Sequence, residues 1–250
     1  EWTNRLLNRY GHQFTLRYQP SERKSHLGGV YTIPVRDPRK DRLSLLAKWE
    51  TEDFESTEIE QRKVTVAYDH IREKGEYSIY LSYLDEDYDT GLESGRSTLL
   101  MPGIKTTWRL ADDRLRTRRG IRATLDLTGA TEELVSDGSF VQASVSSKAI
   151  LALSDQWRLI GQSQVGGTLV DTIFDLPPSL RYYAGGDQSV RGYAYKSIGR
   201  LDQLGNVIGG RFLVTYSIEL ERRLFGSWSS AVFFDSGDAP DSLDNLAMKN

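Results

Sequence analysis

Hydrophobic and polar residues alternate one by one along much of this chain. In residues 214–221, Val, Tyr, Ile and Leu occupy every second position, and Thr, Ser and Glu fill the positions between them. The same pattern recurs in residues 13–19, 63–69, 77–83, 104–109, 121–127 and 141–146. No stretch sustains the spacing of three and four residues that marks one face of a helix. The chain is therefore predicted to be all-β.

Strand length separates a soluble β-sandwich from a membrane barrel. A sandwich also alternates, because each sheet has one buried and one wet face, but its strands are mostly about 5–6 residues long. Many alternating runs here reach about 9–12 residues, the length that crosses a bilayer when the strand is tilted. Charged residues stand on the polar face in mid-strand, which fits a water-filled lumen. We therefore expect a transmembrane antiparallel β-barrel.

The connections between runs support a barrel, because short and long ones alternate as in outer-membrane proteins. The short connections lie near residues 10–12, 36–40, 72–75, 153–155 and 224–227. The long ones lie near residues 21–28, 51–61, 85–97, 128–138 and 170–208. One further connection is basic and is either a solvated turn or a contact for periplasmic domains or a partner; it carries Arg114, Arg116, Arg118, Arg119 and Arg122.

The number of strands predicts an incomplete barrel. We count eleven full strands and a stub at residues 1–8, whereas a bacterial barrel closes with an even number. The chain ends in a loop-like segment, residues 241–250, and not in an aromatic-ended strand. We therefore expect an open piece of a larger barrel.

Composition agrees with β structure and excludes several classes of function. The chain has 13 Tyr, 8 Phe, 5 Trp and 22 Gly, and its mean hydropathy is negative, as in a barrel that turns only alternate residues to lipid. A net charge of -3 argues against a nucleic-acid binder that acts through bulk charge. Because there is no Cys, disulfides and thiolate metal sites are excluded.

An enzyme is the less favoured interpretation. The histidines are His12, His26 and His70, and no Gly-x-Ser-x-Gly motif accompanies them. The segment 235–238, Asp-Ser-Gly-Asp, lacks the full spacing of a calcium loop. We expect no catalytic residue, no metal and no cofactor.

The longest connection, residues 170–208, holds the best candidate for a functional segment. Loops beyond about 12–15 residues are usually functional or disordered, and the centre of this one reads Gly-Gly-Asp-Gln-Ser-Val-Arg-Gly-Tyr. A guanidinium that leaves bulk water needs carboxylates, and Glu219 and Asp235 lie on the polar faces of the two following strands. We infer that the loop folds back into the barrel and that Arg191 pairs with one or both. The alternative is that these charges line a wet pore without touching.

This central segment resembles the VRGF/Y lid-loop motif of the outer membrane protein 85 superfamily of bacterial surface antigen barrels. The residues that carry the motif are Gly185, Gly186, Val190, Arg191, Gly192 and Tyr193. Tyr stands at the last position, where many members have Phe. Residues 232–239 are similar to the later F-x-D-x-G strand motif of the superfamily, and residues 30–38 and 177–198 resemble its TamA (translocation and assembly module subunit) family.

The resemblance implies a 16-stranded barrel in the bacterial cell outer membrane, preceded by periplasmic POTRA domains. Residues 1–250 would form a partial barrel domain from the end of family strand two through strand thirteen, without the POTRA domains, strand one and the last three strands. Residues 170–208 would be the lid loop between strands eleven and twelve. In the family the motif Arg is held inside the barrel by acidic residues on strands twelve and thirteen, and Glu219 and Asp235 occupy those positions.

The function that the resemblance implies is outer-membrane protein assembly or translocation, which inserts or secretes β-barrel proteins such as autotransporters. Its implied partners are unfolded outer-membrane client proteins, the lipid bilayer and a TamB-like protein anchored in the inner membrane. The alternative is a two-partner-secretion-type pore, or another translocation pore of the same superfamily, because the lid motif would be shared. The number and type of upstream domains would distinguish the two.

Overall fold

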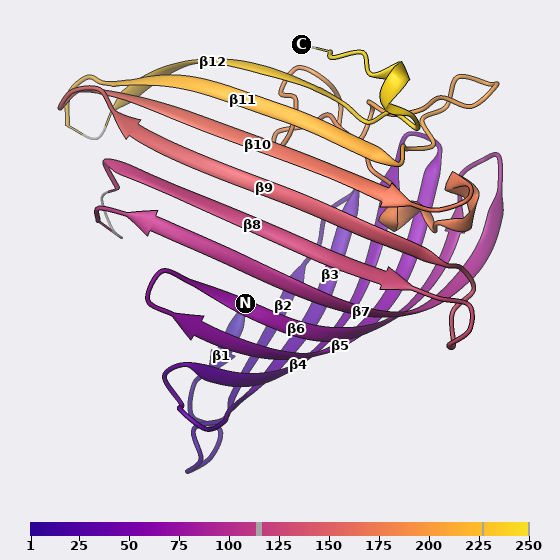
Figure 1. The fold of residues 1–250 in the computed structure, drawn as a ribbon, viewed down its shortest axis with the longest axis horizontal. Coiled ribbons are helices and arrows are strands. Elements are labelled where there is room, and N and C mark those ends of the chain that lie inside the picture. The colour runs from indigo at the N-terminus through magenta and orange to yellow at the C-terminus, as the bar shows by residue number, and fades with distance from the viewer. Residues whose placement is uncertain (114–116, 227, 250) are drawn as a thin grey trace.

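A computed structural model describes residues 1–113, 117–226 and 228–249 of the chain. Within these residues, twelve β-strands form one antiparallel sheet in which each strand pairs with the next along the chain (Figure 1). The strands are β1 (Trp2–Asn4), β2 (Gln13–Gln19), β3 (Lys24–Pro34), β4 (Asp41–Phe54), β5 (Thr57–Arg72), β6 (Gly75–Asp89), β7 (Ser94–Ala111), β8 (Arg119–Ala130), β9 (Phe140–Ala152), β10 (Trp157–Leu169), β11 (Phe212–Arg223) and β12 (Ser229–Asp238).

Three short 3-10 helices complete the secondary structure: η1 (Ile173–Asp175), η2 (Pro178–Leu180) and η3 (Leu243–Asn245). No helix in the described part of the chain has the length and apolar character that a membrane crossing requires. The all-β antiparallel prediction is confirmed, and β2–β12 correspond to the eleven predicted strands. The three-residue β1 corresponds to the predicted stub.

Two connections that we predicted to be long loops are instead strand. β4 and β5 continue to a turn of residues 55–56, and β6 and β7 continue to a turn of residues 90–93. Glu55 adopts a φ of 52° in the first of these turns, a left-handed conformation that lets the chain reverse within two residues. The acidic composition of residues 51–61 and 85–97 hid the alternation, because both faces of a hairpin can be polar once it extends beyond an apolar zone.

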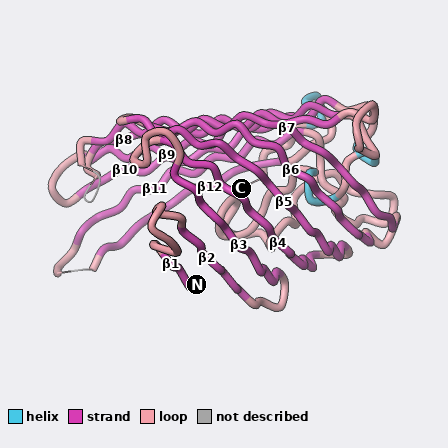
Figure 2. The backbone as a smooth tube through the Cα atoms, turned by 90° about the horizontal axis from the view of Figure 1, so that it is seen from below, coloured by secondary structure: helices cyan, strands magenta, loops and turns pink. Residues whose placement is uncertain are grey.

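The sheet bends into a deep trough (Figure 2). The polarity of its two faces is inverted relative to a soluble protein. Large apolar side chains stand exposed on the outward face of successive strands, as with Ile79 (55% exposed), Ile104 (51%) and Ile218 (51%). The inward face holds buried polar side chains: Ser44, Glu50, Gln61, Ser82, Thr107 and Thr215. This distribution is that of a transmembrane barrel, in which the outer face meets lipid and the inner face meets water.

Many of the buried apolar residues form two small clusters that include residues of the connection between β10 and β11. Figure 1 shows this connection at one end of the sheet. We call this connection, residues 170–211, the lid loop. One cluster contains Leu84, Leu99, Met101, Phe140 and Leu176, and the other contains Ala184, Val190, Ile198, Leu213 and Ala239. Both clusters join the lid loop to the inner face of the sheet, so the packing of this fold is concentrated there.

An introduced charge should be much more destabilising on the outward face of β9 than on its inward face. Val145 points outward, 44% exposed, and pairs with Leu125 and Val165, whereas the adjacent Ser146 points inward. We expect Val145→Arg to lower the free energy of unfolding by about 2–4 kcal/mol, the penalty of Arg at a bilayer midplane. Ser146→Arg should change it by less than about 1 kcal/mol, because its side chain stays in water. Denaturant unfolding of the full-length protein in phospholipid vesicles measures both. Equal losses would contradict the orientation.

Candidate functional site: the lid loop and its anchor

Backbone bridges within the lid loop fold it back on itself. Tyr182 pairs with Gly210, and Ala184 pairs with Ile198. The chain reverses direction between Ala184 and Ile198, and this reversal begins at Gly185, whose φ is 101°. A Cβ atom on Gly185 would lie 2.4 Å from the carbonyl oxygen of Ala194, so this position requires glycine for space as well as for conformation.

Arg191 lies in the part of the lid loop that faces β11 and β12, and each of its four nitrogen atoms donates a hydrogen bond there. Its Nε and Nη2 atoms donate to the two carboxylate oxygens of Asp235 at 2.7 and 2.9 Å, a bidentate pair. Its backbone N–H donates to Asp235 as well, at 3.0 Å. Nη1 donates to Glu219 Oε2 at 3.2 Å, and Nη2 also donates to Ser217 Oγ at 3.1 Å. The loop therefore lies inside the trough, with both predicted carboxylates in contact with Arg191.

The register of β11 and β12 explains why one side chain can reach so many partners. Ser217 faces Asp235 across the ladder, and Glu219 faces Phe233. These four side chains point to the same face because strand residues two apart share a side. Arg191 lies over this square, with its guanidinium carbon 3.5 Å from the centroid of the Phe233 ring. The aromatic face adds a cation–π contact to the charge-assisted hydrogen bonds.

The electrostatics of this anchor depend on its exclusion from water. The Asp235 side chain is 4% exposed and the Glu219 side chain 21% exposed. Hydrogen bonding to Asp235 raises the pKa of the Arg191 guanidinium. Removal of one partner from such a pair would leave a charge without compensation, which costs far more than the pair contributes at an exposed surface.

The other motif residues support Arg191 through the backbone and through packing. Val190 is 2% exposed and packs in the second apolar cluster. A Cβ atom at Gly237 would lie 3.0 Å from the Val190 side chain, so the glycine of the F-x-D-x-G segment leaves room for the lid loop. Tyr193 contributes its carbonyl oxygen, which accepts the N–H of Gly186 at 3.1 Å, and its side chain is 37% exposed.

Several contacts of the lid loop were not found from the sequence. Ser217 and Phe233 share the phase of Glu219 and Asp235, so the alternation could have identified them. Arg181 has a fully buried side chain that donates to the carbonyl oxygen of Leu176 at 2.9 Å and forms an ion pair with Glu93. Glu93 lies in the turn between β6 and β7, and nothing in its local sequence distinguishes it from a solvated loop acid.

The remaining candidate residues do not form a second site of this kind. His12 contacts Tyr31, His26 contacts Glu50 and His70 contacts Asp41, three separate places in the sheet. Over residues 1–113, 117–226 and 228–249, no group of three His, Cys, Asp or Glu residues is arranged to hold a metal ion.

The basic connection near residues 112–120 is seen only in part. Arg114 and Arg116 lie outside the described residues. Arg118 pairs with Asp155, which lies in the connection between β9 and β10, at 2.7 Å.

The chain is similar to known proteins both in sequence and in fold. The sequence model of the Omp85 superfamily domain matches residues 10–245. The crystal structure of BamA from Haemophilus ducreyi lacking POTRA domains 1–3 is similar in fold, with a TM-score of 0.79 and 16% sequence identity. The similarity covers 92% of this chain and 52% of that chain, so this chain spans about half the length of the structure that it matches.

Asp235→Asn should release the lid loop more than Glu219→Gln. Asp235 accepts three hydrogen bonds from Arg191 and is nearly buried, whereas Glu219 accepts one and is more exposed. We expect Asp235→Asn to destabilise the closed loop by about 2–3 kcal/mol and Glu219→Gln by about 1 kcal/mol. The rate of limited proteolysis within residues 170–211 of the folded protein reports loop opening. The reverse order would show that Asp235 is not the main partner.

Proposed function

Because this chain belongs to the Omp85 superfamily, we propose that it is part of an assembly and translocation factor for β-barrel proteins in the bacterial outer membrane. The observation that carries this proposal is the Arg191 anchor, which holds the lid loop on the inner face of a sheet whose outer face is apolar. An enzyme would instead need a nucleophile and a base in reach of each other. The contacts of Arg191 with Asp235 and Glu219 hold the lid loop in place.

The proposed activity follows from a property of lipid. An unfolded client strand cannot enter the hydrocarbon region while its backbone N–H and C=O groups lack partners. A sheet edge offers those partners, because an extended segment can add to it as a further strand. The lid loop would hold the lumen in one state while clients are assembled at such an edge.

Within the superfamily, we assign the chain to the TamA type on the sequences of residues 30–38 and 177–198. Its clients would be autotransporters and similar outer-membrane proteins, and its partner would be a TamB-like protein anchored in the inner membrane. Residues 1–250 would be part of a 16-stranded barrel that follows POTRA domains. The ladder supports only the incomplete barrel in this proposal, since β1 and β12 each pair with a single strand among the described residues. A secretion pore of the same superfamily would share the lid anchor.

Arg191→Ala should impair client assembly more than it lowers the abundance of the barrel. Loss of the anchor weakens the closure of the lid loop while the strand ladder stays intact, and about 1.4 kcal/mol in lid closure already shifts its populations tenfold. We expect autotransporter assembly in cells to fall by roughly tenfold or more. Surface display of an autotransporter and immunoblotting of the barrel measure the two quantities separately.

Arg200→Ala is the matched control. Arg200 lies in the same loop and pairs with Asp241 at 2.7 Å, but its side chain is 40% exposed. Exposed ion pairs contribute about 0–1 kcal/mol, so this variant should assemble clients normally. Normal client assembly by Arg191→Ala at wild-type abundance would refute the role of the lid anchor. If the protein secretes a soluble substrate and does not affect the assembly of barrel clients, the secretion-pore alternative is favoured.

A further inference from the structure

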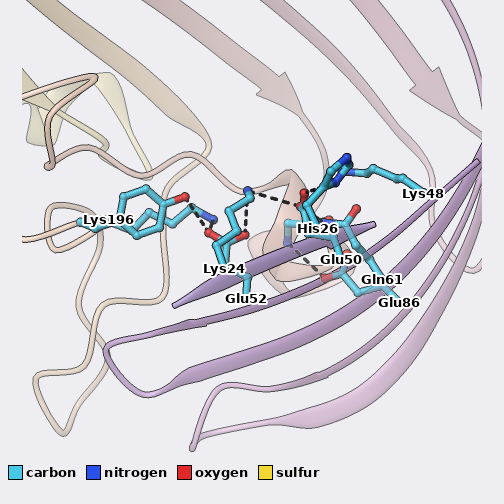
Figure 3. A network of polar contacts seen from close by, with 10 residues as sticks. Lys24, His26, Lys48, Glu50, Glu52, Gln61, Glu86 and Lys196 are labelled. Atoms are coloured by element: carbon cyan, nitrogen blue, oxygen red, sulfur yellow. Dashed lines mark hydrogen bonds and ion pairs between the residues drawn. The ribbon is translucent and has the colours of Figure 1, made fainter. Parts of the chain in front are cut away.

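Five residues after Arg191, the lid loop makes a second set of polar contacts, on a distant part of the sheet. The ammonium of Lys196 lies 2.7 Å from Glu52 Oε1, and the Tyr195 hydroxyl donates to the same oxygen at 2.7 Å (Figure 3). Glu52 lies on β4, which is separated from the Arg191 anchor on β11 and β12 by the strands between them in the ladder. The lid loop therefore crosses the trough from one wall to the other.

The Lys196 side chain is enclosed in a built site. Its ammonium lies 4.3 Å from the ring centroid of Phe54, 5.1 Å from that of Tyr183 and 5.7 Å from that of Tyr195. Aromatic faces attract a cation more strongly when it is shielded from water, and this side chain is 19% exposed. Burial lowers the pKa of the ammonium, which the charge of Glu52 opposes.

The backbone of Lys196 is held in an unfavourable conformation at this site. Its φ of 56° lies in the left-handed region, which residues with a side chain adopt only when their surroundings compensate. The contacts of the ammonium with Glu52 and with the three rings supply that compensation.

The buried negative charge of Glu52 is compensated mostly by residues of the lid loop. Its side chain is 2% exposed, and apart from the lid contacts it pairs with Lys24 at 3.4 Å. Lys24 is shared with Glu50, which also pairs with Lys48 at 3.3 Å and accepts from Gln61 at 2.9 Å (Figure 3). If Lys196 lost its charge while the loop stayed closed, Glu52 would keep one cation, Lys24, which it shares with Glu50. Such a buried carboxylate destabilises the closed loop.

We propose that Lys196 and Glu52 form a second anchor of the lid loop, and that the loop opens fully only when this anchor and the Arg191 anchor both break. Lys196 is then a positioning residue that acts through the loop. The proposed function enters only in the consequence for client assembly, so the position of the loop can be tested without it.

The absence of Cys from these 250 residues allows a direct test in the full-length protein, with any cysteines elsewhere replaced by Ser. Ile198→Cys places a thiol at a position that is 1% exposed, two residues from Lys196. The probe is a maleimide reagent added to outer-membrane vesicles. Lys196→Met should raise the labelling rate at this thiol by roughly tenfold, the change expected when the closed loop loses one buried charge partner.

Three further variants identify the cause of the change. Lys24→Met is the matched control, since it removes a cation from the same carboxylate but from β3, and it should change labelling by less than roughly threefold. Glu52→Gln combined with Lys196→Met should label more slowly than Lys196→Met alone, because the unpaired carboxylate is gone. Heat-modifiable mobility on gels reports whether each barrel is folded. If Lys196→Met fails this assay, Tyr195→Phe gives the same test, because it removes one donor to Glu52.

Unchanged labelling in Lys196→Met would overturn the second anchor, as would equal labelling in Lys24→Met. Client assembly is measured in parallel on the same variants. Faster labelling with normal assembly would support the anchor and refute the proposed role of the loop in assembly. Reduced assembly with unchanged labelling would refute the anchor and leave the proposed function standing.

Discussion

A strand that crosses lipid must find every backbone hydrogen-bond partner in its neighbours, because the hydrocarbon offers none. This constraint accounts for the uninterrupted ladder from β1 to β12 and for the alternation of side chains along it. Once the ladder is fixed, each strand has one face for lipid and one for water. The apolar residues go outward, and the charges that the protein uses go inward, where Asp235, Glu219 and Glu52 meet the lid loop.

The lid loop occupies the place that a hydrophobic core has in a soluble domain. It carries apolar residues into two clusters and carries cations to carboxylates on the wall of the trough. Buried ion pairs contribute little net stability but strongly penalise wrong arrangements. The lid loop is therefore held in one position by specific partners. A segment held in this way can switch between two discrete arrangements when those partners separate and pair again.

The all-β fold, the strand count and the inward orientation of Glu219 and Asp235 could be reached from the phase of alternation in the sequence. The pairing of Arg191 with them is one of two alternatives that the alternation leaves open, and it is favoured by the resemblance of the loop to the lid motif. The outer ends of the β4–β5 and β6–β7 hairpins were predicted as loops because acidic residues on both faces masked the alternation there. The contacts of Lys196 with Glu52 and of Arg181 with Glu93 could not be predicted. Those partners lie far apart along the chain, and they meet only because the sheet curves.

The long hairpins also have a mechanical consequence. Glu52 on β4, Glu86 on β6 and Glu93 in the turn after β6 all contact the lid loop, through Lys196, the Ser179 N–H and Arg181 respectively. The tips of the hairpins and the lid loop are thus joined by direct polar contacts. A displacement of the tips would therefore act on the lid loop directly, through contacts that are already formed.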